Sequence, residues 1–171
     1  ECAKKFSMST IVRIPSDKPL IDPTIVDENI KFFNENSYDY VTNFLSKSTC
    51  PSGTEVEIFT YNALEIAYKN AKLPSEKEHV TPYFPNHENE FKIKHRENSE
   101  NLSNLRFAVD RSEDLELVKI IISKINKRPI LLEDIMNLYK NEKEIFEINQ
   151  EYITDEGYLK SLKEDVEFKK G

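Results

Sequence analysis

Residues 10–23 read TIVRIPSDKPLIDP, and in this stretch an apolar run leads directly into an acid. Residues 11–14 contain isoleucine and valine side chains, which are typical of the end of a buried strand. Asp17 follows within a few residues, and prolines on both sides of it hold the chain extended. The placement of this carboxylate, directly beyond a strand, is the feature that the sequence leaves to be explained.

Composition sets the limits on the class of protein. The chain has 171 residues, 38% of them hydrophobic, which is enough for one domain with a sizeable core and too few for two full domains. The 24 basic residues are outnumbered by 31 acidic ones, and the formal net charge is −7. Basic residues interleaved with aromatic ones do not form a cluster, so we expect no nucleic-acid partner.

The distribution of apolar residues and cysteines indicates the compartment. No apolar run approaches the roughly 20 residues that a membrane-spanning helix needs, so we expect no membrane association and a cytoplasmic location. Cys2 and Cys50 stand alone, without the close spacing of a zinc site or a disulfide framework. We therefore interpret them as ordinary reduced thiols.

Periodicity predicts strands and helices in alternation, which is typical of an α/β sheet with flanking helices. The strands expected from apolar alternation are residues 10–14, 38–44, 54–59, 90–98 and 104–110. The helices expected from the 3.6-residue period are residues 2–6, 23–36, 61–72, a short one near 75, 112–126, 131–140 and 142–149. The domain is predicted to cover residues 1–150, with residues 151–171 as a charged, solvated and weakly helical C-terminal extension.

Helix starts and faces follow from capping residues and spacing. Asp22 is expected to cap a helix that begins at Pro23, and Ser75 with Glu78 to form a capping box. Ser112 is the expected N-cap of the helix at 112–126. The residues predicted to face the core are Leu64, Ala67 and Tyr68 in one helix, and Leu115, Val118, Ile122 and Ile125 in another.

Two of the predicted strands end in an acid, one at Asp17 and the other at Asp110. In open α/β sheets a ligand lies beyond the carboxyl ends of the strands, so these two carboxylates could converge and hold a divalent cation. Mg²⁺ favours one or two carboxylates together with waters and substrate phosphates, which suits so small a ligand set. The alternative is that Asp17 simply ends a strand and Asp110 simply precedes a helix, and spacing alone does not decide between them.

Three stretches, TIVRIPSDKPLIDPTIVDENIKFF, PSGTEVEIFTYNALEIAYKNAKLPSEKEHVTPYF and NLRFAVDRSEDLELVKII, together resemble the acylneuraminate-type cytidylyltransferase family. The similarity is to its spore-coat-polysaccharide branch, relatives of the enzymes that make CMP-activated sialic acids and CMP-Kdo. The resemblance implies a Rossmann-like nucleotidyltransferase sheet, CTP and a sugar as substrates, Mg²⁺ as cofactor and pyrophosphate as the released product. It also implies that the reaction belongs to surface polysaccharide biosynthesis. It also makes Asp17 and Asp110 the metal ligands and catalytic residues, and a homodimer a possible assembly.

The chain departs from this family in one respect. Family members begin with a strand and a basic, glycine-containing loop of the type A-R-x-G-S-x-R-L-P-G-K, which cradles the nucleotide phosphates. That loop is not in this sequence, whose glycines are Gly53, Gly157 and Gly171. We therefore expect a sheet that is incomplete on its N-terminal side, with Ile11 and Val12 exposed along it. The alternative function is a non-catalytic half that binds a partner chain or a sugar without turnover.

The resemblance also proposes sugar-binding residues. Glu55 and Glu57 lie on one side of a predicted strand beside the sugar, although a solvated strand face would explain them equally well. Glu78 and His79 fall in the family's helix near the sugar pocket, where His79 could orient a hydroxyl or act as a base. The simpler alternative for these two is a capping glutamate beside a partly buried histidine.

Two further charged residues have alternatives of the same kind. Arg13 could contact a phosphate or pair with a neighbouring acid. Asp114 fits the family's acid pair, but as an early helical residue it could simply favour the helix dipole. His87 and His95 lack the ligand spacing of a zinc site.

Overall fold

A computed structural model of the chain describes residues 1–44, 48–150 and 156–170. Its sheet has four strands in the order β1-β3-β2-β4. The central strand β3 is antiparallel to both of its neighbours, whereas β2 and β4 run parallel. The strands are β1 (Thr10–Arg13), β2 (Tyr40–Thr42), β3 (Glu57–Thr60) and β4 (Ile93–His95).

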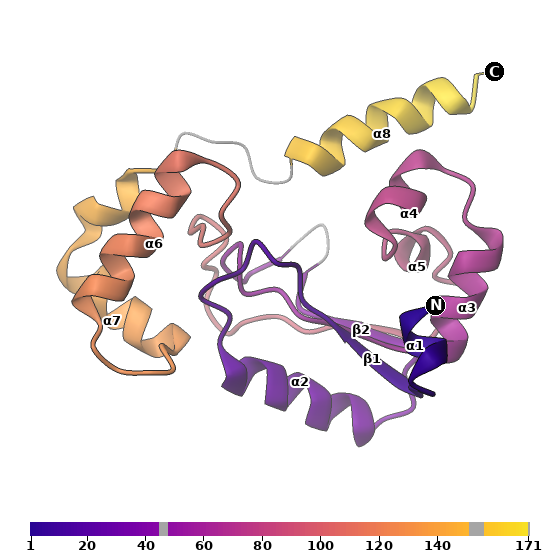
Figure 1. Ribbon diagram of the computed structural model, residues 1–171, viewed down its shortest axis with the longest axis horizontal. Coiled ribbons are helices and arrows are strands. Elements are labelled where there is room, and N and C mark those ends of the chain that lie inside the picture. The colour runs from indigo at the N-terminus through magenta and orange to yellow at the C-terminus, as the bar shows by residue number, and fades with distance from the viewer. Residues whose placement is uncertain (45–47, 151–155, 171) are drawn as a thin grey trace.

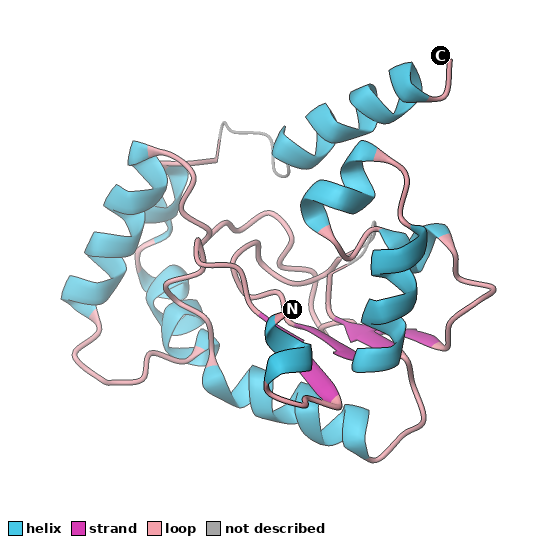
Figure 2. Cartoon of the chain, turned by 45° about the vertical axis from the view of Figure 1, so that its right-hand side comes forward, coloured by secondary structure: helices cyan, strands magenta, loops and turns pink. Residues whose placement is uncertain are grey.

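Helices lie on both faces of this sheet and to one side of it (Figure 1). Figure 2 shows long loops between the strands and the helix pair α6 and α7. The helices are α1 (Cys2–Lys5), α2 (Pro23–Asn34), α3 (Tyr61–Asn70), α4 (Pro74–His79), α5 (Tyr83–Asn86), α6 (Ser112–Lys124), α7 (Leu132–Asn141), the 3-10 helix η1 (Lys143–Glu147) and α8 (Glu156–Phe168).

The two faces of the sheet follow from the alternation of side chains along paired strands. Tyr40 is opposite Phe59, and both pack with Phe84 and the helix α3 on one face. Val41 is opposite Ile58, and both pack against α2 on the other face. Because β2 and β3 are covered on both sides, nearly all of their side chains are buried.

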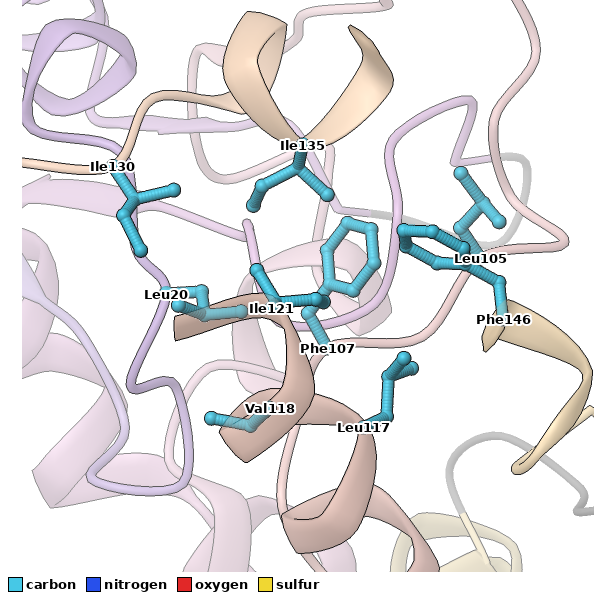
Figure 3. Close-up of a cluster of buried hydrophobic side chains, with 9 residues drawn as sticks. All are labelled: Leu20, Leu105, Phe107, Leu117, Val118, Ile121, Ile130, Ile135 and Phe146. Atoms are coloured by element: carbon cyan, nitrogen blue, oxygen red, sulfur yellow. The ribbon is translucent and has the colours of Figure 1, made fainter. Parts of the chain in front are cut away.

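A third apolar cluster, the α6–α7 core, lies beside the sheet (Figure 3). Leu105 and Phe107 enter it from a loop, and Leu20 enters it from the turn after β1. Its buried members are Leu20, Leu105, Phe107, Leu117, Val118, Ile121, Ile130, Ile135 and Phe146. This core therefore ties the segments around Asp17 and Asp110 to the same helices.

One sequence prediction of a helix start is confirmed. Asp22 caps α2, because its carboxylate accepts a hydrogen bond from the backbone N–H of Thr24 at 2.7 Å, and Pro23 is the first helical residue. The other carboxylate oxygen of Asp22 accepts from the N–H of Leu132 at 2.7 Å. The same acid thus starts α2 and holds the beginning of α7.

The predicted strand at 104–110 is wrong. This segment makes only an isolated parallel bridge, between Ser52 and Arg106, and its apolar side chains enter the α6–α7 core rather than a sheet. Residues 105–108 are all buried, because this loop packs against another loop on one side and against the α6–α7 core on the other. The strands predicted at 38–44 and 90–98 are shorter than expected, as β2 and β4.

The predicted apolar faces need correction in two helices. Tyr68 is 86% exposed, and Ala63 with Ala67 carries the buried face of α3. In α6 the buried apolar residues are Leu117, Val118 and Ile121, whereas the predicted Leu115 and Ile122 are exposed. The buried face of α6 is the one that lies against η1 and α7. Periodicity alone predicted a face that is displaced by about one residue along the helix.

Two predicted N-termini also differ. The helix α4 begins at Pro74, and Glu76 rather than Glu78 closes it by accepting from the backbone N–H groups of Lys72 and Leu73. In α6 the N-cap is Arg111, so Ser112 is already helical. In each case an acid at the third helical position fixes the start.

The C-terminal segment forms a helix that packs against another helix, whereas the sequence predicted a solvated extension. Within the described residues, α8 packs against α4, and Ser161 and Asp165 are buried there. Residues 151–155 and 171 lie outside the described residues, and the division at residue 150 stays a prediction.

Membrane association was not expected from the sequence. Across the described ranges, no helix combines the length and apolar character that crossing a bilayer requires.

Gly53 provides a test of the packing between loops. Its φ is +97°, and an added Cβ would lie 2.6 Å from the carbonyl carbon of Phe107. We expect Gly53→Ala to lower the free energy of unfolding by about 2 kcal/mol or more, because it adds both backbone strain and a clash. Urea unfolding followed by circular dichroism measures this change.

The matched control is Gly157→Ala in α8, where an added Cβ meets nothing within 4 Å. This variant should be neutral or slightly more stable, because alanine favours a helix. Equal stability of Gly53→Ala and wild type would contradict the close approach of the two loops.

Candidate functional site

Three loop segments, residues 15–20, 51–55 and 105–110, meet beside the sheet, and we call this place the loop junction. The N–H of Val109 donates to the carbonyl of Asp17 at 2.8 Å. The N–H of Phe107 donates to the carbonyl of Ser52 at 2.6 Å. Asp17 and Asp110 are therefore neighbours in space, although they are far apart along the chain.

The sequence predicted that Asp17 and Asp110 end two strands of one sheet, and this geometry is wrong. Asp17 lies in a turn beyond β1, and Asp110 follows a loop segment. The backbone hydrogen bond from Val109 nonetheless brings the two acids to one place. Asp17 is partly buried and the Asp110 side chain is 58% exposed, so the latter is open to a ligand. Their joint role as metal ligands stays a prediction.

The carboxylate of Asp110 is held by the guanidinium group of Arg106. Arg106 is anchored in turn by the buried carboxylate of Asp114, whose Oδ1 accepts from Nε at 3.0 Å. Asp114 also accepts from the Nδ2 of Asn149 at 2.8 Å and from the N–H of Asp110 at 3.0 Å. One buried acid thus fixes both the arginine and the backbone at Asp110.

The environment of Asp114 keeps it ionised. Burial by itself raises the pKa of this carboxyl, but hydrogen bonds from Arg106, Asn149 and the backbone outweigh burial and hold the pKa below its ordinary value. Its carboxylate also accepts from the N–H of Arg111 at 3.1 Å, at the start of α6. Asp114 therefore closes the helix N-terminus and anchors Arg106, while its buried position turns it away from solvent.

Glu55 belongs to the loop junction and pairs with Lys18. The Lys18 Nζ lies 2.7 Å from the Glu55 Oε2, and the two side chains are only 10% and 5% exposed. The same oxygen accepts from the N–H of Gly53 at 2.8 Å. The alternative of a solvated strand face is wrong for Glu55, and its predicted contact with a sugar stays a prediction.

Glu57 lies in the centre of the sheet rather than at the junction. Its carboxylate accepts from the hydroxyl of Tyr40 at 2.6 Å and forms an ion pair with Arg13 on the neighbouring strand. Burial, and then the nearby carboxylate, raise the pKa of Tyr40 well above its ordinary value. Of the two alternatives for Arg13, pairing with an acid is the one that the structure has, and the solvated face is wrong for Glu57 as well.

Glu78 and His79 lie on α4 and face α8. The hydroxyl of Ser161 donates to the Glu78 Oε2 at 2.9 Å, and the His79 Nε2 lies 3.1 Å from the same hydroxyl oxygen. The ring of Tyr158 meets the ring of His79 edge-on, with centroids 5.5 Å apart. The structure brings this pair together with a hydroxyl, on the opposite side of the molecule from α6 (Figure 1).

The remaining histidines and the pocket beside α1 offer no further candidate site. Within the described part of the chain, no group of three or more His, Cys, Asp and Glu side chains is arranged to hold a metal ion. His87 stacks on Tyr83, with ring centroids 3.9 Å apart. A shallow pocket beside α1 is lined by residues such as Met8 and Tyr61, and no predicted site residue lines it.

Sequence reasoning missed Lys18, Gly53, Arg106 and Asn149. A signal for Arg106 existed, because it precedes Asp110 and Asp114 at intervals of four, but the segment was taken as a strand. Lys18 directly follows Asp17 between prolines, where a charge among apolar neighbours could have indicated a buried pair. Asn149 carried no signal, because its partner is distant in the sequence.

Comparisons with known proteins agree with this architecture. A family model described as cytidylyltransferase matches residues 1–156. An uncharacterized protein of Methanocaldococcus jannaschii, MJ1063, is 37% identical over 117 residues, covering 67% of this chain and 46% of that protein. The spore coat polysaccharide biosynthesis protein SpsF of Bacillus subtilis is 30% identical over 126 residues, covering 71% of this chain and 50% of that protein.

A solved structure is similar over most of the fold. It is a cytidylyltransferase from Leptospira borgpetersenii serovar Hardjo-bovis, with a TM-score of 0.81 and 31% sequence identity, covering 85% of this chain and 61% of that chain. This similarity confirms the Rossmann-like α/β class that the sequence predicted. The mixed four-stranded sheet with flanking helices is the part of that fold described here.

These matches define a cytidylyltransferase-type α/β fold. The chain belongs to the cytidylyltransferase family. It spans about half the length of the curated relatives that it matches.

The low pKa of Asp114 predicts how stability depends on pH. Its folded pKa lies below its unfolded value, so its contribution is present above about pH 4 and is lost as pH falls through the folded pKa. Asp114→Asn should lower the free energy of unfolding by about 3 kcal/mol near neutral pH. It should also flatten the loss of stability below pH 4.

Urea unfolding between pH 2 and 7 measures both effects. Asp27→Asn on the exposed face of α2 is the control, and it should change neither the stability nor its pH dependence. An unchanged acid slope in Asp114→Asn would contradict the buried ion pair with Arg106.

Proposed function

We propose that this chain supplies the metal-binding and sugar-binding side of an enzyme that transfers CMP from CTP to a sugar hydroxyl and releases pyrophosphate. The proposed context is surface polysaccharide biosynthesis in the cytoplasm, in keeping with the similarity to SpsF. The observation that supports the proposal is the backbone hydrogen bond from the N–H of Val109 to the carbonyl of Asp17, which joins the segments that carry Asp17 and Asp110 in a member of the cytidylyltransferase family.

The donor set at the loop junction fits Mg²⁺. Asp17 and Asp110 offer carboxylate oxygens, the ligands that this hard cation prefers, and a pair of them is enough when waters and substrate phosphates complete the shell. Asp110 is exposed enough to accept such a ligand while Arg106 holds one of its oxygens. Bound Mg²⁺ would neutralise charge on the phosphate oxygens of CTP.

The residues of the chain would act mainly by positioning. Arg106, anchored by Asp114, keeps the carboxylate of Asp110 in a fixed orientation at the junction. Glu78 and His79 are proposed to take a sugar hydroxyl, and in the structure they bind the hydroxyl of Ser161. Well-oriented groups lower the barrier to an in-line displacement because little reorganisation remains at the moment of reaction.

A binding role without turnover is the second candidate, and the edge of the sheet favours it. Among the described residues β1 is the last strand on its side, and Val12 on it is 36% exposed. Ile14 just beyond β1 is also exposed, whereas the expected exposure of Ile11 is wrong, because Ile11 packs partly against the cluster of Tyr40 and Phe59. An unpaired edge with apolar side chains can accept a strand from a partner chain.

Substitution of the two acids tests the proposed reaction. In the longest polypeptide that the reading frame encodes, Asp17→Asn and Asp110→Asn should each lower kcat by about 100-fold or more, because each removes a metal ligand. Pyrophosphate release from CTP with a sialic or Kdo-like acid measures this rate. Asp27→Asn is the matched control and should leave the rate unchanged.

Two outcomes would count against the proposal. If the variant with asparagine at both positions 17 and 110 releases pyrophosphate at a rate within threefold of wild type, Asp17 and Asp110 are not metal ligands of the reaction. No pyrophosphate release by the wild-type polypeptide with any such sugar, together with a stable complex through the β1 edge, would favour the binding role.

A further inference from the structure

The turn that carries Asp17 has no helix or strand to fix it. Residues 14–20 lie between β1 and α2 without ladder hydrogen bonds of their own. Contacts with other described segments that hold this turn include the burial of Leu20 in the α6–α7 core, the hydrogen bond from Val109 to Asp17, and the ion pair of Lys18 with Glu55. Of these, only the ion pair joins a side chain next to Asp17 to the sheet side of the junction.

The ion pair is part of a closed ring of contacts. Glu55 receives Lys18 and also the N–H of Gly53. Gly53 lies directly against the backbone of Phe107 and Ala108, and the next residue of that segment, Val109, donates to Asp17. The ring therefore closes at Asp17, the residue before Lys18. If the ion pair were lost, the position of Asp17 relative to Asp110 would be less fixed.

Stability alone does not account for a buried pair of this kind. Removing two charges from water costs much of what their attraction returns, and apolar side chains of similar size often stabilise a protein equally well. What a buried pair with a hydrogen-bonded neighbour does provide is a fixed geometry. Lys18 has its Nζ turned into the protein toward Glu55, which also argues against a direct contact with a substrate phosphate.

We propose that Lys18 and Glu55 are positioning residues that hold Asp17 beside Asp110 at the loop junction. The inference rests on the proposed function of these two acids as metal ligands. It assigns to Glu55 a role in orienting a ligand of the metal instead of a contact with the sugar. Groups hydrogen-bonded to metal ligands change metal affinity by about 10- to 100-fold when they are replaced, and Lys18 and Glu55, which act on Asp17 through the backbone, should have an effect at the lower end of that range.

The test compares Lys18→Met/Glu55→Gln with wild type in the 171-residue chain. Replacing both residues avoids an unpaired buried charge, and glutamine keeps an acceptor for the N–H of Gly53. The matched control is Lys69→Met/Glu65→Gln, an exposed pair on α3 at 3.1 Å. Asp17→Asn serves as the reference for loss of the metal ligand itself.

Two measurements are made on each variant. Hydrogen exchange at the amide of Val109 reports the bond to Asp17, with Ile121 in the buried face of α6 as the internal reference. Isothermal titration with Mn²⁺ reports the affinity of the junction. In the double variant we expect exchange at Val109 to be about tenfold faster with Ile121 unchanged, and Mn²⁺ affinity to fall about tenfold or more.

The possible results separate this inference from the function on which it rests. If Asp17→Asn abolishes Mn²⁺ binding but the double variant binds Mn²⁺ as wild type does, the positioning role is overturned and the metal role stands. If wild type does not bind Mn²⁺, or binds it equally after Asp17→Asn, both are overturned. Loss of Mn²⁺ affinity in the exposed α3 control would also overturn the inference.

Discussion

Gly53 allows the backbone of one loop to lie directly on the backbone of another, and the rest of the molecule depends on this close approach. With a positive φ and no side chain, it meets Phe107 and Ala108 where any Cβ would collide. That contact joins the sheet to the α6–α7 core, since Phe107 is buried among the side chains of α6 and η1. The segments that carry Asp17 and Asp110 lie at this contact, because Val109 follows Ala108 and donates to the carbonyl of Asp17. Their proximity is thus a consequence of how two separately packed regions are fastened together.

Sequence patterns predicted the elements whose causes are local. Asp22 and Pro23 carry the start of α2 within a few residues, and the α/β class follows from alternation along the whole chain. The apolar pattern of residues 104–110 is also that of a buried strand, but these residues form a loop that packs on the α6–α7 core and makes an isolated bridge with another loop. The pair of Asp17 and Asp110 could be named from the residues and the family resemblance. The contacts that hold this pair in place could not be predicted, because Lys18 pairs with Glu55, and Asp114 with Asn149, across distant parts of the sequence.

The docking of α8 shows a different use of polar groups. It meets α4 through Ser161 and Asp165, and the carboxylate of Asp165 accepts from both the N–H and the hydroxyl of Ser75, at 2.9 and 2.6 Å. Apolar side chains of α8 such as Leu159 and Val166 remain exposed. Hydrogen bonds need a specific geometry, whereas apolar contacts do not, so this interface is more selective than it is strong. It places a serine hydroxyl at Glu78 and His79, the residues proposed to bind a hydroxyl of the sugar.

The central claim is that the loop junction presents Asp17 and Asp110 as two ligands of one divalent cation. The most direct measurement is anomalous scattering from a crystal of the protein soaked in Mn²⁺, which substitutes for Mg²⁺. The account predicts a peak between the two carboxylates, about 2 Å from an oxygen of each or separated from one of them by a single water. A peak bound elsewhere, or carboxylates that are well ordered in the soaked crystal with no peak between them, would contradict it.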